Sequence, residues 1–305
     1  MELDRRTVLK TTAAAFGAGA AGWMPDAALA APLTRTIPST GQALPLVGLG
    51  SWVTFNVGNN QKLLDSSADV MAAFFESGGR LIDSSPMYGS AQATIGYALR
   101  KFAGTGQVFS ADKVWTSSAA DGLQQIETSR SFWGVPKFDL LQVHNLVAWE
   151  DHLETLQAMK AAGSLKYIGV TTSHGRSHGE LEKILASQPI DFVQFTYNIK
   201  DREAEQRLLP LAKERGIAVI INRPFQRGYL VEQFEGKPLP GWAAEAGITS
   251  WAQFLLTYVI SHPAVTCAIP ATSKVEHVRE NMAAASGQLP DAATRNRMAD
   301  YAAQL

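Results

Sequence analysis

The chain has 305 residues, and its 27 lysines and arginines against 28 aspartates and glutamates give a formal net charge of −1. This balance argues against nucleic acid as a partner, because nucleic-acid-binding surfaces need an excess of basic residues on one face. Hydrophobic residues make up 46% and charged residues 18%, a composition that excludes a globally disordered chain. The single cysteine, Cys267, excludes an intrachain disulfide and a cysteine-based zinc site.

Residues 1–30 have the features of an export signal. Two adjacent arginines, Arg5 and Arg6, precede a weakly apolar run from Thr11 to Trp23, and Ala28-Leu29-Ala30 has the A-x-A pattern of a cleavage site. The paired arginines and the glycine-rich middle resemble a twin-arginine (Tat) signal. The order of these features predicts a Tat-type signal peptide, export to the periplasm by the Tat machinery, and cleavage after Ala30.

An N-terminal membrane anchor that is never cleaved is the alternative for this segment. Its apolar run of about 13 residues is too short to span a bilayer, so no stable membrane insertion is expected after cleavage. Residues Gly17–Gly22 match the G-x-G-x-x-G pattern of dinucleotide-binding loops. A phosphate-binding loop of that kind must follow a strand and open a helix. Because this match lies inside the predicted signal, we reject it.

Residues 31–305 alternate short apolar runs with amphipathic stretches. The strand-like runs are Leu46–Leu49, Arg80–Ile82, Gln107–Phe109, Asp139–Val143, Lys166–Val170, Asp191–Phe195, Ile217–Ile221 and Val265–Ile269. The stretches with helical spacing are Leu63–Ser77, Gln92–Lys101, Gly122–Phe132, Trp149–Ala162, Gly179–Ser187, Glu203–Arg215, Ser250–Ser261 and Lys274–Ala285. This alternation predicts βαβ units and a parallel sheet. Eight units in about 250 residues favour one α/β domain, a (β/α)8 TIM barrel, over a doubly wound open sheet.

Ionisable side chains follow four of the predicted strands. Asp83 follows the second strand, Lys113 the third, His144 the fourth and Arg223 the seventh. Tyr88 lies five residues after Asp83, in a loop closed by a glycine. Active sites of such barrels are built where the strands end and the βα loops begin. We therefore expect these side chains to meet at one rim of the barrel.

The stretches around these residues resemble the motifs of the aldo-keto reductase superfamily. In chain order the motifs are Gly48–Trp52, Leu81–Ser90, Gln142–Asn145, Tyr167–Val170, Val193–Gln194, Ile269–Pro270 and Glu280–Asn281. Each motif alone is weak, but all of them occur in order, each at the end of its own strand. The resemblance implies a (β/α)8 barrel that reduces a small-molecule carbonyl, an aldehyde or a ketone, to an alcohol by hydride transfer from NADP(H).

The resemblance implies a catalytic tetrad of Asp83, Tyr88, Lys113 and His144. Tyr88 would give a proton to the alkoxide that a carbonyl becomes when it receives a hydride. A free tyrosine has a pKa of about 10, and a nearby ammonium lowers it, so Lys113 would tune Tyr88. Asp83 would orient Lys113, and His144 would hydrogen-bond the carbonyl oxygen and polarise it.

Eleven cofactor-binding residues are implied in the same way: Gly50, Trp52, Asn145, Thr172, Gln194, Arg223, Phe225, Ser273, Lys274, His277 and Asn281. Asn145, Thr172 and Gln194 stand where the family holds the nicotinamide carboxamide. Arg223 and its neighbours lie on the loop that covers the pyrophosphate. The last four residues fall at the start of the last helix, and a helix N-terminus favours anions. Lys274 could meet a 2′-phosphate, which favours NADPH over NADH.

The role of Lys113 depends on where the third strand ends. If the strand occupies Gln107–Ser110, Lys113 follows it directly. If the strand is Val114–Thr116, the catalytic position shifts to residues 117–119, Ser-Ser-Ala, none of which is a base. We prefer the first reading, because the thirty-one residues from Lys113 to His144 then fit one helix and one strand.

Several positions depart from the family pattern, namely Gln92 for an acidic residue, Asp112 for a hydroxyl residue, Thr171-Thr172 for Ser-Asn, Asn222 for a stacking aromatic and His277 for Arg or Gln. The tetrad survives these departures, which bear on cofactor affinity. His174 and His178 are four residues apart, but the segment is interpreted as a solvated loop and no metal site is predicted, because no carboxylate pair accompanies them.

Two further questions stay open at this stage. The aromatic residues near strand ends, Trp52, Trp115, Trp149 and Phe225, either line an apolar substrate pocket or pack against loops. NADP(H) is scarce in the periplasm, so the alternative function is an NADP-binding sensing or regulatory barrel subunit without significant turnover. A hydrolase or lyase is disfavoured, because the strand ends carry no paired carboxylates.

Overall fold

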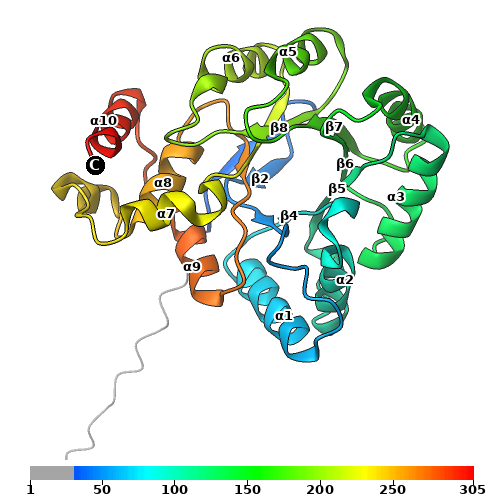
Figure 1. Cartoon of the computed structure of the whole chain (residues 1–305), viewed down its shortest axis with the longest axis horizontal. Helices are drawn as coiled ribbons and strands as arrows, with labels where there is room; N and C mark the ends of the chain where they lie inside the picture. The colour runs from blue at the N-terminus through cyan, green and yellow to red at the C-terminus, as the bar shows by residue number, and fades with distance from the viewer. Residues whose placement is uncertain (1–30) are drawn as a thin grey trace, which may run out of the picture. The chain divides into compact units, whose positions relative to one another are not determined.

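Eight parallel strands form the centre of the computed structural model, which describes residues 31–305 (Figure 1). They are β3 (Leu49–Gly50), β4 (Leu81–Asp83), β5 (Phe109–Val114), β6 (Leu140–His144), β7 (Tyr167–Thr171), β8 (Phe192–Thr196), β9 (Ala218–Asn222) and β10 (Cys267–Ala268). Each strand pairs with the next along the chain. The predicted signal lies outside the described residues.

The sheet closes between its first and last strands. Val47 pairs with Ala268, and Gly50 pairs with Ala271, both in parallel orientation. A Cβ atom on Gly50 would lie 2.9 Å from the carbonyl oxygen of Ile269, so only glycine lets the two segments approach this closely. The predicted (β/α)8 barrel is therefore confirmed.

Helices surround the barrel (Figure 1). Those that follow the strands are α1 (Gln61–Glu76), α2 (Ala91–Lys101), α3 (Ala119–Trp133), α4 (Trp149–Ala161), α5 (His178–Ser187), α6 (Leu208–Glu214), α8 (Trp251–Ile260) and α9 (Val275–Ala283). Within residues 31–305, no helix combines the length and the apolar character needed to cross a bilayer. The 3-10 turns are η1 (Pro86–Tyr88), η2 (Gly104–Gly106), η3 (Glu203–Glu205), η4 (Gln226–Gly228) and η5 (Gly241–Ala246).

Some elements differ from the sequence prediction. The alternation of runs did not predict helices α7 (Tyr229–Phe234) and α10 (Ala292–Ala303), nor the hairpin of β1 (Thr34–Thr36) and β2 (Ala43–Pro45). The predicted helix Glu203–Arg215 is divided into η3 and α6. Pro210 explains the division, because a proline inside a continuous helix would clash with the carbonyl four residues earlier, whereas the first turn of α6 tolerates it.

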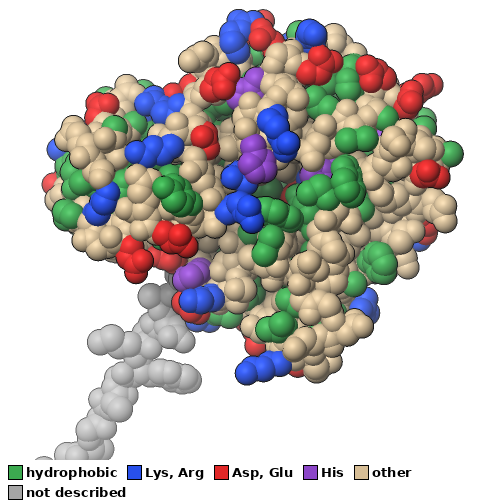
Figure 2. All heavy atoms as spheres, viewed as in Figure 1, with side chains coloured by type: hydrophobic (Ala, Val, Ile, Leu, Met, Phe, Trp, Pro, Cys, Tyr) green, Lys and Arg blue, Asp and Glu red, His purple; other side chains and the backbone are tan. Residues whose placement is uncertain are grey.

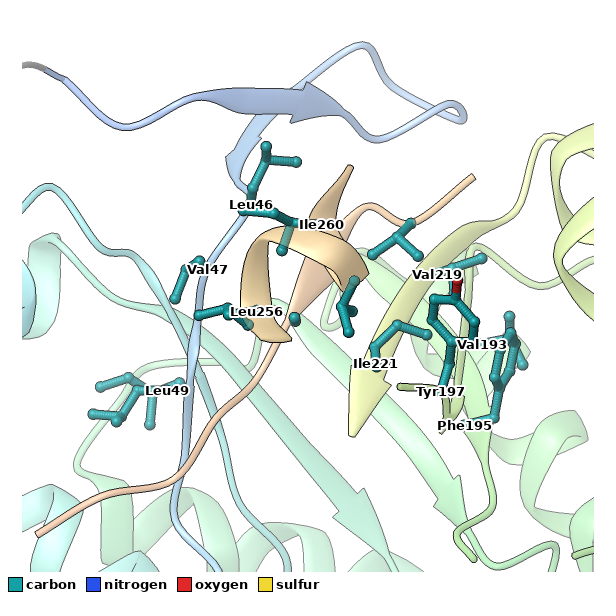
Figure 3. Packing of buried hydrophobic residues seen from close by; sticks show 14 of the residues in the cluster. Leu46, Val47, Leu49, Val193, Phe195, Tyr197, Val219, Ile221, Leu256 and Ile260 are labelled. Atoms are coloured by element: carbon teal, nitrogen blue, oxygen red, sulfur yellow. The ribbon is translucent and has the colours of Figure 1, made fainter. Parts of the chain in front are cut away.

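The strands bury side chains on both of their faces. Val193 and Val219, on neighbouring strands, pack in the outer layer with Leu256 and Ile260 of α8 (Figure 3). The residues of the inner layer come from the strands and from the hairpin, which contributes Leu44. Full burial of one such aliphatic side chain is worth about 1.5–3 kcal/mol. The hairpin therefore closes one end of the barrel. The candidate site lies at the opposite end of the barrel, where the strands end.

The third strand is longer than predicted and contains Lys113. Strand β5 runs to Val114, all six of its residues are buried, and Lys113 pairs in register with Gln142 of β6. Neither predicted position of this strand, Gln107–Ser110 or Val114–Thr116, is correct. The reason is that Ser110, Asp112 and Lys113 are polar and interrupt the apolar run from which a buried strand is normally recognised.

Candidate active site

A cavity of about 570 Å³ opens where the strands end, and most of the predicted site residues line it. Those that do are Gly50, Trp52, Asp83, Tyr88, His144, Asn145, Gln194, Arg223, Phe225, His277 and Asn281. Thr172 lines a smaller adjoining pocket together with Asn145. Ser273 and Lys274 lie outside the lining and are exposed just before α9. The volume suits a small-molecule ligand.

A buried ion pair forms the base of this cavity. Lys113 Nζ lies 2.6 Å from Asp83 Oδ2, with both side chains almost fully buried. The ammonium also donates to the carbonyl oxygen of Ser84 at 2.7 Å. Burial is the largest single influence and disfavours the charged lysine. Electrostatic interactions with Asp83, Tyr88 and Asp112 and the hydrogen bond to Asp83 together outweigh it, so the pKa of Lys113 is raised above its usual value. Gln194 Nε2 donates to the second carboxylate oxygen of Asp83 at 2.8 Å, so the carboxylate is held from two sides.

Tyr88 ends the short turn η1 and lies against the same lysine. Lys113 Nζ is 5.2 Å from the centre of the Tyr88 ring, and that ring meets His144 edge-on at 5.7 Å between ring centres. Burial raises the pKa of Tyr88 to about 12, and the charge of Lys113 offsets only part of this rise. The proximity of Lys113 in the sequence-based prediction implies a net lowering of this pKa, but in the free protein burial has the larger effect. The phenol is therefore protonated at neutral pH, as a proton donor must be.

His144 is the last residue of β6, and its ring is neutral. Burial, with a smaller contribution from the charge of Lys113, lowers the pKa of His144 to about 3. Its Nδ1 atom lies 2.7 Å from Oγ of Ser85. The structure thus brings Asp83, Tyr88, Lys113 and His144 together from three strands and one turn, as the sequence predicts.

Beside this cluster lies a buried hydroxyl that no other described residue hydrogen-bonds. Within residues 31–305, the buried Thr172 Oγ1 has no hydrogen-bond partner. Asn222, which stands in place of a stacking aromatic, donates to the Thr172 carbonyl oxygen at 2.8 Å and to Gln194 Oε1 at 3.2 Å. Asn222 therefore holds two of the predicted carboxamide-binding residues in place, although it offers no aromatic face of its own.

Cationic side chains gather at the mouth of the cavity. Figure 2 shows Lys or Arg and His side chains beside hydrophobic ones near the middle of one face. His174, Arg176, Arg223 and Arg227 line the cavity. Among the described residues, nothing hydrogen-bonds to the buried Nε and Nη1 atoms of Arg223, and the guanidinium of Arg227 lies 4.5 Å from the centre of the Trp52 ring. A group of guanidinium ions of this kind suits an anionic ligand.

Sequence reasoning missed Arg176 and Arg227 as lining residues. The sequence did contain an indication for Arg227, because it lies four residues after Arg223 on the loop that follows the seventh strand. Both adopt positive φ angles, 52° and 67°, which turn this loop over the cavity in a way that no hydrophobic pattern indicates.

Two of the departures from the family pattern contact each other. Gln92 Nε2 of α2 donates to Asp112 Oδ2 at 2.8 Å and to Ser129 Oγ at 2.9 Å. The other oxygen of Asp112 accepts from the Lys113 backbone N–H at 2.7 Å. Burial raises the pKa of Asp112 to about 7. An acidic residue at position 92 would face the buried carboxyl group of Asp112 and be repelled by it. The amide of Gln92 instead donates a hydrogen bond to that carboxyl group, so the substitutions at positions 92 and 112 compensate each other.

Of the four aromatic residues near strand ends, two line the cavity and two do not. Trp52 and Phe225 line the cavity. Trp115 is 41% exposed, with its ring centre 6.5 Å from that of His144, and Trp149 packs against the outer core. Within residues 31–305, no three or more His, Cys, Asp and Glu side chains form a metal-binding group.

Comparison with known proteins places this geometry in a family. The model of the aldo/keto reductase family matches residues 46–296. The aldo-keto reductase YhdN of Bacillus subtilis is 28% identical over 228 residues, 67% of each protein. An uncharacterized oxidoreductase of Schizosaccharomyces pombe, C215.11c, is 30% identical over 173 residues, and the match spans 54% of this chain and about half, 53%, of that protein.

Solved structures have the same fold. An aldo/keto reductase from Klebsiella pneumoniae in complex with NADP and acetate is 24% identical, with a TM-score of 0.73 over 86% of this chain and 92% of that one. The holo form of aldo-keto reductase AKR11C1 from Bacillus halodurans has a TM-score of 0.73 at 19% identity, over 89% and 96% of the two chains. Because the family model matches most of the chain and the barrel is shared, this protein is an aldo-keto reductase and belongs to the aldo/keto reductase family.

Proposed function

We propose that the protein reduces the carbonyl group of a small molecule, an aldehyde or a ketone, with NADPH as hydride donor. The observation that carries the proposal is the meeting of a protonated phenol, a buried Lys–Asp pair and a neutral imidazole at one wall of a cavity. That cavity has a cationic mouth. Reduction of a carbonyl needs a proton donor at its oxygen, and these groups provide one.

The residues present fit a nicotinamide dinucleotide. The hydroxyl of Thr172, which has no partner within residues 31–305, would hold the carboxamide together with the side chains of Asn145 and Gln194. Arg223 and Phe225 would hold the pyrophosphate, since two buried guanidinium nitrogens of Arg223 lack a partner within residues 31–305. The residues at the start of α9 would hold the adenosine end, and Gly50 and Trp52 would border the opposite side. When bound, NADPH supplies the hydride.

The side chains of this protein act on the carbonyl oxygen. His144 would donate a hydrogen bond to that oxygen and favour the negative charge that develops there. Tyr88 would transfer its phenolic proton to the oxygen as the carbon receives the hydride, which leaves a tyrosinate. Lys113 would stabilise this tyrosinate through its ammonium charge, and Asp83 would keep Lys113 charged and in position.

The test uses purified protein comprising residues 31–305 and follows the loss of NADPH absorbance with a panel of aldehydes, ketones and quinones. We expect turnover with at least one class. Saturable NADPH binding without turnover on any carbonyl would instead favour a sensing or regulatory barrel subunit. Absence of both binding and turnover would contradict each of these functions.

Lys274 is expected to distinguish NADPH from NADH. Substitution Lys274→Ala removes the charge proposed to face the 2′-phosphate, and we expect the Kd of NADPH to rise about 10-fold, or about 1.4 kcal/mol, while that of NADH changes little. Fluorescence titration of both cofactors measures this difference. Lys137→Ala is the matched control, since Lys137 precedes β6 at the other end of the barrel. An equal loss for both cofactors would show that Lys274 does not contact the 2′-phosphate.

Export to the periplasm is the second part of the proposal. The order of arginine pair, weakly apolar run and A-x-A site in residues 1–30 supports it. We expect the periplasmic fraction of expressing cells to contain protein that begins at Ala31, as determined by N-terminal sequencing. Substituting lysine for both Arg5 and Arg6 should retain the precursor in the cytosol. Full-length protein with an intact Met1 in the cytosol of cells carrying the native sequence would contradict export.

A further inference from the structure

Ser85 joins the two residues that would act on the substrate oxygen. It is fully buried and lies between β4 and η1. Its hydroxyl oxygen accepts the backbone N–H of Met87 at 3.2 Å, and its carbonyl oxygen accepts the backbone N–H of Tyr88 at 2.9 Å. The same hydroxyl lies 2.7 Å from Nδ1 of His144. One side chain therefore caps the turn that carries Tyr88 and also contacts the His144 ring.

The direction of the Ser85–His144 hydrogen bond follows from counting protons. A serine hydroxyl has one proton to donate and two lone pairs with which to accept. The Met87 N–H occupies one lone pair, and within residues 31–305 the only acceptor in contact with the hydroxyl is Nδ1 of His144. A buried hydroxyl without an acceptor costs about 1–3 kcal/mol, so Ser85 donates its proton to Nδ1. Nδ1 is then the unprotonated nitrogen of the ring.

The hydrogen bond at Nδ1 determines the protonation of the other ring nitrogen of His144, Nε2. A neutral imidazole carries one proton, and if Nδ1 accepts, the proton is on Nε2. His144 lines the cavity, and since Nδ1 is directed to Ser85, Nε2 is the nitrogen left for a ligand. In this tautomer the ring can donate to a carbonyl oxygen. In the opposite tautomer Nε2 would present a lone pair to that oxygen and repel it.

We propose that Ser85 is a positioning residue that holds the His144 ring in its Nε2–H tautomer, so that the ring donates a hydrogen bond to the substrate carbonyl. This inference rests on the proposed carbonyl reduction. Loss of one preorganised donor to a developing oxyanion lowers turnover by about 10²–10³-fold. Without Ser85 part of the ring population would still adopt the Nε2–H form, so we expect a fall in kcat of about 10- to 100-fold.

The experiment reads the tautomer in the free protein, independently of turnover. Protein with ¹⁵N-labelled histidines is studied by long-range ¹H–¹⁵N NMR, and the His144 signals are assigned by their absence from a His144→Gln variant. Wild type, Ser85→Ala and Ser85→Thr are compared. Ser67→Ala is the matched control, because it removes a buried serine hydroxyl that bonds only to the Leu63 carbonyl on α1.

We expect His144 to carry its proton on Nε2 in the wild type and in Ser85→Thr, which keeps the hydroxyl. We expect Ser85→Ala to shift the ring toward the Nδ1–H form and to lower kcat with little change in the Kd of NADPH. A wild-type ring protonated on Nδ1 would overturn the proposal, even if the alanine variant did not fold. An unchanged tautomer in Ser85→Ala would also overturn it, whatever the effect on kcat.

The same measurements separate this inference from the proposed function. If wild-type protein shows the expected tautomer but reduces no carbonyl, the proposed function fails and the effect of Ser85 on the ring still stands. If wild-type protein reduces carbonyls but its tautomer does not depend on the hydroxyl, the inference about Ser85 fails and the proposed function stands.

Discussion

Replacing Tyr88 with phenylalanine is expected to lower kcat for carbonyl reduction by about 10³-fold, within the range attributed to general acid catalysis. The substitution removes the phenolic proton and leaves the ring that packs edge-on against His144. His144 can still hydrogen-bond the oxygen, but the phenolic proton proposed for transfer to the alkoxide is gone, so chemistry becomes the slow step. Binding of NADPH should change by no more than about twofold, since the phenol is proposed to act on the substrate oxygen. Stopped-flow NADPH absorbance and cofactor titration measure the two quantities.

The matched control for this prediction is Tyr301→Phe. Tyr301 lies on α10, and its hydroxyl donates to the carbonyl oxygen of Pro238, outside the cavity. We expect the kcat of this variant to stay close to that of the wild type. Turnover in Tyr88→Phe equal to that of the control would remove Tyr88 from the mechanism, and with it the assignment of the tetrad.

Replacing Lys113 with methionine is expected to reduce both activity and stability. The methionine fills a similar volume but leaves Asp83 as a buried carboxylate without its cation, and breaking a buried ion pair in this way costs about 3–5 kcal/mol of unfolding free energy. The tyrosinate also loses the ammonium that stabilises it, so kcat should fall along with stability. Urea denaturation followed by circular dichroism gives the stability change, and the NADPH assay gives kcat.

The double variant Asp83→Asn with Lys113→Met tests the cause of this instability. Removing both charges should recover much of the lost stability, because no unpaired carboxylate remains, but it should not restore activity. Lys101→Met breaks an ion pair with Asp65 in which both partners are about 40% exposed, and it should change stability far less. Equal effects of Lys113→Met and Lys101→Met on the unfolding transition would contradict the role assigned to the buried pair.

Much of the fold and of the candidate site was predictable because their signals are local. Alternating strand-like and helical runs predicted eight parallel strands, and each of the eight predicted runs overlaps an observed strand, although the third run shares only Phe109 with β5. Asp83, His144 and Arg223 each stand at or directly after the end of a strand. In a closed parallel barrel all strand ends meet at one rim, so local position was enough to predict that these side chains converge.

Lys113 lies beside Asp83 as expected, although the predicted boundaries of its strand were wrong. Its strand was placed too early, because polar residues interrupt the apolar run, yet the lysine still reaches Asp83 from inside β5. The inner face of this strand continues from Phe109 and Ala111, which belong to the inner core, to Lys113. Side chains alternate between the two faces of a strand, so Lys113 points to the same face as Phe109 and Ala111. That direction can be predicted only when the true boundaries of the strand are known.

The sequence by itself determined the barrel, the order of its strands and the residue types at their ends, because each depends on periodicity within a few neighbouring residues. Only the tertiary structure decided which groups touch: Ser85 with His144, and Gln92 with Asp112. It also decided the balance between burial and charge at Tyr88, where burial prevails. These partners lie on different strands and helices, so no local pattern in the chain encodes their contact. The protonation states that the chemistry needs follow from that packing.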